Sequence, residues 1–129
     1  MKKIYKVLII VSICLLVVGS GITYFITMIQ KGLENVMNLE ISTLDLSGVD
    51  DGIYQGEYSA FPIKVIVDVT IENHLITNIQ IIKHDTGQGK PAEVIIDDVI
   101  DAQSSNVDLI SGASYSSQII LLAIDDAIN

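Results

Sequence analysis

The residues from Val7 to Met28 form an uninterrupted stretch of 22 residues without a charged side chain. Most of them are Val, Ile, Leu or small residues. As a helix rising ~1.5 Å per residue, such a stretch reaches about 33 Å, enough to cross a hydrocarbon core ~30 Å thick. The stretch therefore predicts one membrane-spanning helix, and it leaves any globular fold to the residues that follow.

The lysines that flank this stretch are unequally distributed. Lys2, Lys3 and Lys6 precede it, whereas only Lys31 follows it closely. Positively charged flanks tend to stay in the cytoplasm. We therefore expect residues 1–6 to form a cytoplasmic basic tail and the part after the span to lie outside the cytoplasm, in a single-pass protein of the cell membrane.

A cleaved signal peptide is the alternative to an uncleaved anchor over residues 7–28. The apolar run is longer than the ~7–15 residues of a signal core. Its small residues, Gly19, Ser20 and Gly21, lie inside the run rather than after it, so no clear cleavage site ends it. These features favour the anchor.

The residues after Met28 carry a strong negative charge. They contain all 16 acidic residues of the chain against four lysines, a net charge of −12, and the chain has no arginine. This charge argues against nucleic acid as a partner, and the lack of arginine excludes a bidentate guanidinium clamp for phosphate. A phosphorylated cofactor would need backbone amides, hydroxyls, a lysine or a covalent bond.

Cys14 is the only cysteine and lies within the apolar stretch. No disulfide can form within one chain, and no cysteine cluster is present for an iron–sulfur centre or a tetrahedral zinc site. The two histidines, His74 and His84, do not make a metal site. We therefore predict no metal, and stability that comes from an apolar core or from a ligand.

Hydrophobic patterning predicts a connector at 29–50, built as a stalk that begins as a short amphipathic helix, and one small domain at 51–129. In the domain, Val65, Val67, Val69 and Ile71 share one face of a predicted strand, and the residues on the other face include Lys64, Asp68, Thr70 and Glu72. This is the pattern of a strand with one buried face and one that is largely solvent-exposed. A turn at 72–74 leads to a second alternating run, which predicts an antiparallel hairpin with a further strand nearby.

Two helices complete the predicted domain. Pro91 is well placed as the first residue of a helix with an apolar stripe, and an apolar closing helix starts at or just after Ser114. The fold class is therefore α+β: a small antiparallel sheet with packed helices, preceded by one N-terminal transmembrane helix.

A small-residue motif precedes the closing helix. It reads Ser111-Gly112-Ala113-Ser114-Tyr115-Ser116-Ser117. Gly112 and Ala113 leave room for a bulky ligand, and the unpaired amides of a helix N-terminus favour a phosphate on the Ser114 hydroxyl. The alternative is that Ser114 is a plain N-cap, worth about 1 kcal/mol.

With Asp108 included, the stretch Asp-Leu-Ile-Ser-Gly-Ala-Ser resembles the flavinylation motif of the FMN-binding domain family. That family includes the C subunit of the sodium-translocating NADH:quinone reductase and the G subunit of the Rnf electron-transport complex. The resemblance extends over residues 51–129, from an opening Asp-Gly-Ile-Tyr-Gln-Gly-Glu-Tyr to the closing helix. It implies FMN in phosphoester linkage to Ser114, loaded from FAD by a separate magnesium-dependent flavin transferase.

The resemblance also implies which residues surround the cofactor. These are Ser111, Gly112, Ala113, Ser114, Tyr115, Ser116 and Ser117, with Asp108 orienting the loop and His84 near the flavin. Two departures stand out: the acceptor is serine rather than the commoner threonine, and the loop at residues 85–89 lacks the proline of larger members. A structural role is the alternative for His84.

These features together predict a membrane-anchored electron carrier without a catalytic side chain of its own. Its partners would be the membrane, a flavin transferase, and a redox donor and acceptor that the sequence does not identify. Two alternatives are a module that binds FMN reversibly and a cofactor-free interaction domain tethered to the membrane. An enzyme with its own substrate is disfavoured because no nucleophile–base pair is visible.

Overall fold

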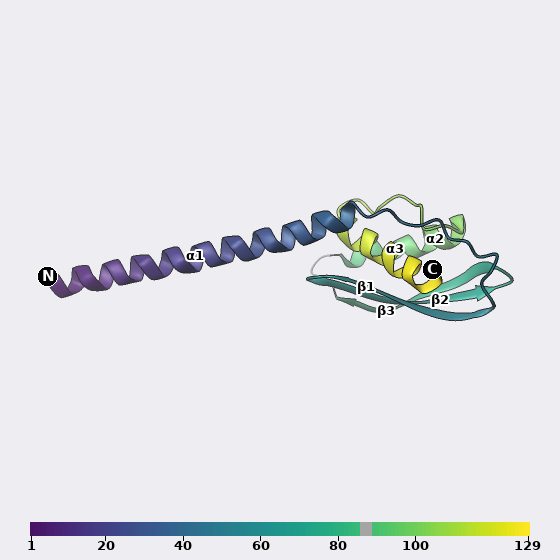
Figure 1. Ribbon diagram of the computed structural model, residues 1–129, viewed down its shortest axis with the longest axis horizontal. Helices are drawn as coiled ribbons and strands as arrows, with labels where there is room; N and C mark the ends of the chain where they lie inside the picture. Colours follow the sequence, from purple (N-terminus) through teal and green to yellow (C-terminus); the bar gives the residue numbers. More distant parts are fainter. Residues whose placement is uncertain (86–88) are drawn as a thin grey trace. The chain divides into compact units, whose positions relative to one another are not determined.

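The computed structural model describes residues 1–85 and 89–129 (Figure 1). The chain divides into two compact units, Met1–Gly32 and Leu33–Asn129. Residues 86–88, which make up most of the loop at residues 85–89, lie outside the described part.

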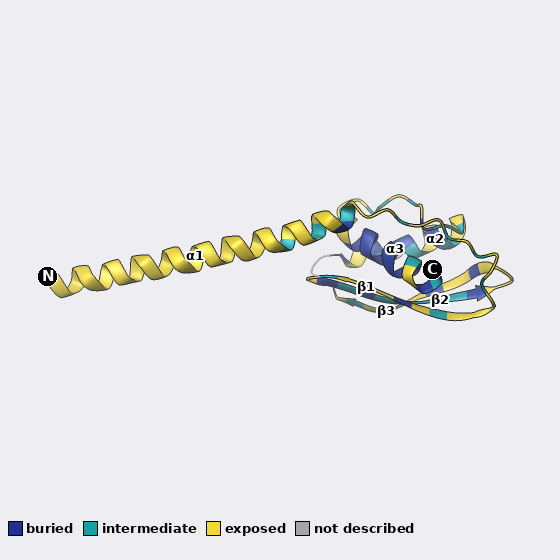
Figure 2. Ribbon diagram, viewed as in Figure 1, coloured by how far each residue is buried: buried dark blue, intermediate teal, exposed yellow. Residues whose placement is uncertain are grey.

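Helix α1 runs without a break from Lys2 to Met37. Its most apolar window has a mean hydropathy of 2.5, and the side chains of that window are not buried against the rest of the chain (Figure 2). By length and composition it is a helix that can cross a membrane. From Leu33 onward it belongs to the second unit, where Val36 is buried, as the predicted amphipathic continuation requires.

The second unit contains an antiparallel sheet of three strands in the order β1-β2-β3, with the bounds Gly52–Ala60, Ile63–Glu72 and Leu75–Asp85. On the central strand β2, Val65, Val67, Val69 and Ile71 are fully buried. The residues between them are partly exposed on the other face. The alternation in the sequence therefore predicted the buried face of the sheet correctly. The turn between β2 and β3 has positive φ at Asn73 and His74.

Three helical segments follow the sheet: the 3₁₀ turn η1 (Lys90–Val94), α2 (Ile95–Ala102) and α3 (Ser114–Ile128). Helix α3 packs against β1 and β2, whereas α2 packs against β3. The central part of α3 is fully buried, as the dark ribbon in Figure 2 shows. The architecture is α+β, as predicted.

Close contact between β1 and α3 depends on Gly56. A Cβ atom on this glycine would collide with the carbonyl oxygen of Ala123 and lie 2.5 Å from the nitrogen of Ala127. The amide of Glu57, the next residue of β1, donates a 2.9 Å hydrogen bond to the carboxylate of Asp126 in α3. The helix is thus held at one position along the strand, which also determines where its first residue lies.

The residues between α1 and β1 pack along the domain. Ile41, Leu44, Leu46 and Val49 lie against the core. Gln118 of α3 donates a 3.0 Å hydrogen bond to the carbonyl of Leu39. Connector residues from Leu33 onward are therefore part of the folded unit.

Two polar contacts add to this packing. The exposed His74 has its Nδ1 3.0 Å from the carbonyl oxygen of Leu46. Ser47 donates hydrogen bonds from its hydroxyl and its amide to Asp45, which lowers the pKa of that carboxyl.

Candidate functional site

The small-residue motif forms a tight turn directly before α3. The amide of Ala113 donates a 3.0 Å hydrogen bond to the carbonyl of Ile110. Gly112, the third residue of the turn, has φ of +79°, which L side chains rarely adopt. A Cβ atom there would meet open space, so the glycine is required by its backbone angle and not by crowding.

Ser117 holds this turn from inside the domain. Its hydroxyl donates to the carbonyl of Ala113 at 2.8 Å and accepts a 3.0 Å hydrogen bond from the amide of Ile110. The side chain is fully buried. The hydroxyl of Ser117 is thus engaged within the turn, and it positions the motif.

Ser114 is the first residue of α3 and is exposed. The N-cap position belongs to Ala113, and within the part of the chain that the structure describes no side chain caps the helix. Ser114 therefore does not fill the capping role that was the alternative explanation for it. Its hydroxyl is presented to solvent beside the first amides of the helix, which have no acceptor within the helix itself.

The other predicted site residues divide by exposure. Asp108, Ser111 and Tyr115 are exposed, with Tyr115 at 39%, whereas Ala113 and Ser116 are buried. The first turn of α3 carries no acidic residue. The helix dipole at this end favours an anion, and no acidic side chain of the first turn opposes it, although the domain as a whole is acidic.

His84 lies near the end of β3, and its side chain is only 2% exposed. Its Nδ1 is 2.9 Å from Oε1 of Glu93 in η1. The second ring nitrogen, Nε2, is buried and has no hydrogen-bond partner among the described residues. The segment η1 packs against α3, so Glu93 belongs to an element in direct contact with the helix that begins at Ser114.

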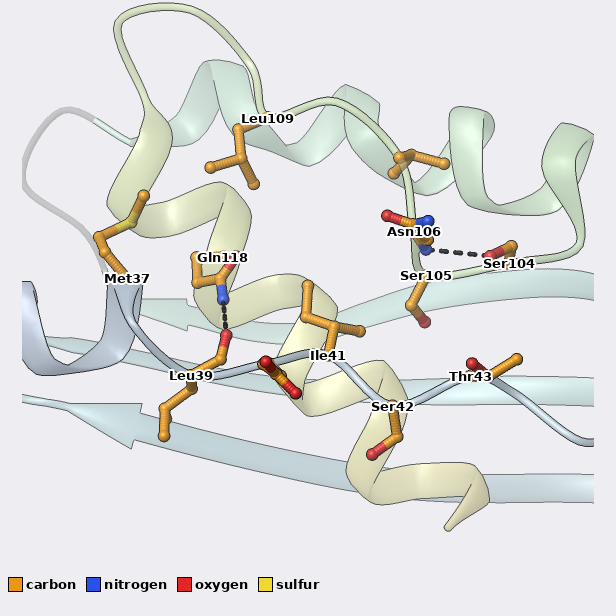
Figure 3. Close-up of a pocket in the computed structure, with 12 residues that line it drawn as sticks. Met37, Leu39, Ile41, Ser42, Thr43, Ser104, Ser105, Asn106, Leu109 and Gln118 are labelled. Atoms are coloured by element: carbon orange, nitrogen blue, oxygen red, sulfur yellow. Dashed lines mark hydrogen bonds between the residues drawn. The ribbon is translucent and has the colours of Figure 1, made fainter.

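A cavity of about 490 Å³ lies beside α3, between the connector and the loop that leads to the motif (Figure 3). Its lining includes Leu39, Ser105, Leu109 and Gln118. The hydroxyl of Ser105 is buried without a hydrogen-bond partner in the described part of the chain. None of the predicted motif residues is among those that line it.

Sequence reasoning did not single out Glu93, Ser105 or Gln118. Glu93 and Gln118 become notable only through contacts with residues elsewhere in the chain, and Ser105 only through its buried hydroxyl, which has no partner among the described residues. No spacing rule predicts these features. Glu93 is nine residues from His84, across the loop that contains residues 86–88. Gln118 reaches the connector 79 residues earlier.

Comparison with known families bears on this site. A search among curated proteins found no match, and neither did a search among solved structures. The model of the FMN-binding domain matches residues 58–129, which include all three helical segments after the sheet, the motif and His84. The match covers more than half of the chain, and the chain therefore belongs to the FMN-binding domain family, as a flavin-binding module that follows a helix able to cross a membrane.

Proposed function

We propose that this protein is a membrane-anchored electron carrier that holds FMN covalently, through a phosphoester to Ser114, on the outer side of the cytoplasmic membrane. The observation that carries the proposal is the exposed Ser114 hydroxyl at the start of α3, presented by a tight turn and not used as a helix cap.

The residues around Ser114 suit a phosphate. Gly112 and Ala113 place no large side chain next to the hydroxyl, and a Cβ atom at Gly112 would meet open space. The first amides of α3 and the helix dipole favour negative charge at this end. No arginine is needed for such a site, in keeping with a chain that has none.

Loading would follow from the chemistry of the hydroxyl. The Ser114 Oγ forms a bond to the phosphorus of the FMN half of FAD, the bond between the two phosphates breaks, and AMP leaves while the hydroxyl gives up its proton. A separate magnesium-dependent flavin transferase would carry out this step. The domain contributes a positioned acceptor and no catalytic side chain.

The other motif residues would support the attached group in different ways. Ser111 and Gly112 shape the turn, Ser117 holds it in place, and Tyr115 lies on the surface next to the acceptor. The exposed Asp108 would be recognised by the transferase. Ser116 belongs to the first turn of α3, the helix end at which the phosphate would lie.

Bound FMN would supply the redox chemistry, and the protein would fix its position and environment. A covalent bond is useful outside the cytoplasm because a dissociated cofactor would be diluted into the surroundings. The anchor would keep the carrier at the membrane, where a redox donor and an acceptor can be reached by diffusion in two dimensions.

The test is the intact mass of the full-length protein co-produced with a flavin transferase. We expect the mass to rise by one FMN minus one water in the wild type and in Ser59→Ala, an exposed serine of β1, but not in Ser114→Ala. An adduct that persists in Ser114→Ala would refute the site. Flavin that leaves the protein on denaturation would indicate reversible binding, and colourless protein would indicate a domain without cofactor.

A further inference from the structure

Residues 38–49, which lead from the end of α1 toward β1, form a strap without a helix or a strand. Among the described residues, its backbone–backbone hydrogen bonds reach back only three residues, as from Leu39 to Val36 and from Val49 to Leu46. None of its residues is fully buried, whereas most residues of α3 are. Segments with few buried side chains and few backbone hydrogen bonds to the rest of a fold are those that open locally.

The strap lies at the edge of the core and not at its centre. Its contacts with the core come from four apolar side chains that are each only partly buried: Ile41, Leu44, Leu46 and Val49. Fully buried residues such as Val67 and Ile120 belong to β2 and α3, which pack directly against each other. The centre of the core therefore does not depend on the strap.

The first half of the strap is docked across a gap. The cavity of about 490 Å³ lies between this half and the loop before α3 (Figure 3). Leu39 and Ile41 line it from the strap, and Asn106 and Leu109 line it from the loop. Since protein interiors leave few voids larger than a water molecule, release of this half costs less packing than release of a close-packed segment.

Two side chains of the domain hold the strap by its backbone. Nε2 of Gln118 donates a 3.0 Å hydrogen bond to the carbonyl of Leu39, as Figure 3 shows. Nδ1 of His74 lies 3.0 Å from the carbonyl oxygen of Leu46, which can only accept, so this nitrogen is the donor. Water can replace either partner once the strap leaves, so each contact contributes only modestly to the docked state.

We propose that residues 38–49 undock from the domain as a unit while the sheet and α3 remain folded. The carbonyl of Asp50, next in the chain, accepts a 2.8 Å hydrogen bond from the Tyr54 hydroxyl of β1, so release ends there. Fully extended at ~3.3–3.6 Å per residue, the released strap spans about 40–43 Å. An anchored carrier with such a tether can reach a donor and an acceptor at different distances from the span. This use rests on the proposed function, but the undocking itself requires neither flavin nor Ser114.

Distances between two spin labels, measured by pulsed electron paramagnetic resonance on the unloaded full-length protein in detergent, test the undocking. In a Cys14→Ser background, Ser42→Cys labels the strap and Ser59→Cys labels β1, both at exposed positions. We expect two distance populations, a narrow docked one and a broad undocked one. The pair Ser59→Cys and Asp98→Cys lies within the domain, on β1 and the exposed side of α2, and should give one narrow population.

Two variants should shift the populations. Gln118→Leu removes one hydrogen bond and should raise the ratio of undocked to docked protein by about two- to tenfold. Leu44→Ala weakens the packing from the side of the strap, so it should raise the ratio too, and it keeps the test decisive if Gln118→Leu does not fold. The matched control is Gln55→Leu, which removes an amide that donates to Asp68 within the sheet and should leave the ratio unchanged.

Three results would overturn the proposal. The first is a single docked distance in the wild type and in both variants. The second is a broadened distance for the pair within the domain wherever the undocked population appears, because the domain would then unfold together with the strap. The third is an equal increase in Gln55→Leu and Gln118→Leu, which a general loss of stability would explain. Since these samples carry no flavin, the mass experiment on Ser114 succeeds or fails independently.

Discussion

Ser114 and Ser117 lie three residues apart and have opposite structural roles. The hydroxyl of Ser114 faces solvent, whereas that of Ser117 is buried and makes two hydrogen bonds with the turn before the helix. Ser117→Ala leaves the amide of Ile110 without its acceptor, so we expect it to lower the free energy of unfolding by about 1–3 kcal/mol. Ser114→Ala should change it by less than about 0.5 kcal/mol, as for most surface substitutions.

Urea unfolding of the full-length protein in detergent, followed by tyrosine fluorescence, measures both changes. Ser117→Ala should also reduce flavin loading, because the turn that presents Ser114 loses its support. Full loading together with unchanged stability in Ser117→Ala would contradict the role assigned to this hydroxyl.

Gly112 carries a second prediction at the level of single residues. Its φ of +79° is costly for any residue with a side chain, although nothing would crowd a methyl group there. Gly112→Ala should therefore lower the free energy of unfolding by about 1–2 kcal/mol. The matched control is Gly48→Ala, which is equally uncrowded and has no positive φ, and it should leave the stability nearly unchanged. Equal effects of the two variants would show that backbone strain is not the cause.

At the level of secondary-structure elements, the contact between β1 and α3 is the one most sensitive to a small change. The space at Gly56 is occupied by backbone atoms of Ala123 and Ala127, which cannot rotate away. Gly56→Ala should force the helix off the strand and cost about 3 kcal/mol or more. In Gly52→Ala, on the same strand, the added methyl group would be 3.7 Å from the Tyr54 ring, an ordinary contact.

Hydrogen exchange of the α3 amides measures the effects of Gly56→Ala and Gly52→Ala. Gly56→Ala should raise exchange along the helix, and Gly52→Ala should leave it close to that of the wild type. Because the position of α3 determines where Ser114 lies, loading of Gly56→Ala by the transferase should fall as well. Protection of α3 that is unchanged in Gly56→Ala would disprove the close packing.

The sheet and the helices were predictable because their signals are local. Alternation of Val65, Val67 and Val69 depends only on the two-residue period of a strand, and the start of the closing helix follows from its apolar spacing. The role of Gly56 was only partly predictable. A glycine inside a strand suggests a close approach of backbone, but it does not say which element approaches.

The same difference between local signals and contacts across the fold applies to the candidate site. The place of Ser114 at the start of α3 was predictable because one contiguous motif contains this serine, the turn before it and the first turn of its helix. The pairing of His84 with Glu93 was not, since it depends on how the chain returns from the end of β3 through η1. Likewise, the spacing at 29–37 predicted a helix, but it could not show that the connector beyond it packs on the core.

At the scale of the whole molecule, two units with different surroundings share one chain. The first is an apolar helix whose side chains find no burial within the chain, and the second has a core of its own. Net charge separates them further, since every acidic residue lies after the span. An acidic surface is repelled by anionic lipid headgroups, so the charge of the second unit does not favour binding to an anionic membrane surface.

The orientation of the anchor yields the last prediction. Lys2, Lys3 and Lys6 should keep the N-terminus in the cytoplasm, which places the flavin domain outside. In a Cys14→Ser background, Ser59→Cys introduces a single thiol on the exposed surface of β1, and Ile4→Cys introduces one in the N-terminal tail. A membrane-impermeant maleimide applied to intact cells should label Ser59→Cys alone, and it should label both variants after permeabilisation. Labelling of Ile4→Cys in intact cells would place the domain in the cytoplasm. A covalent bond that prevents loss of FMN to the surroundings would have no purpose there.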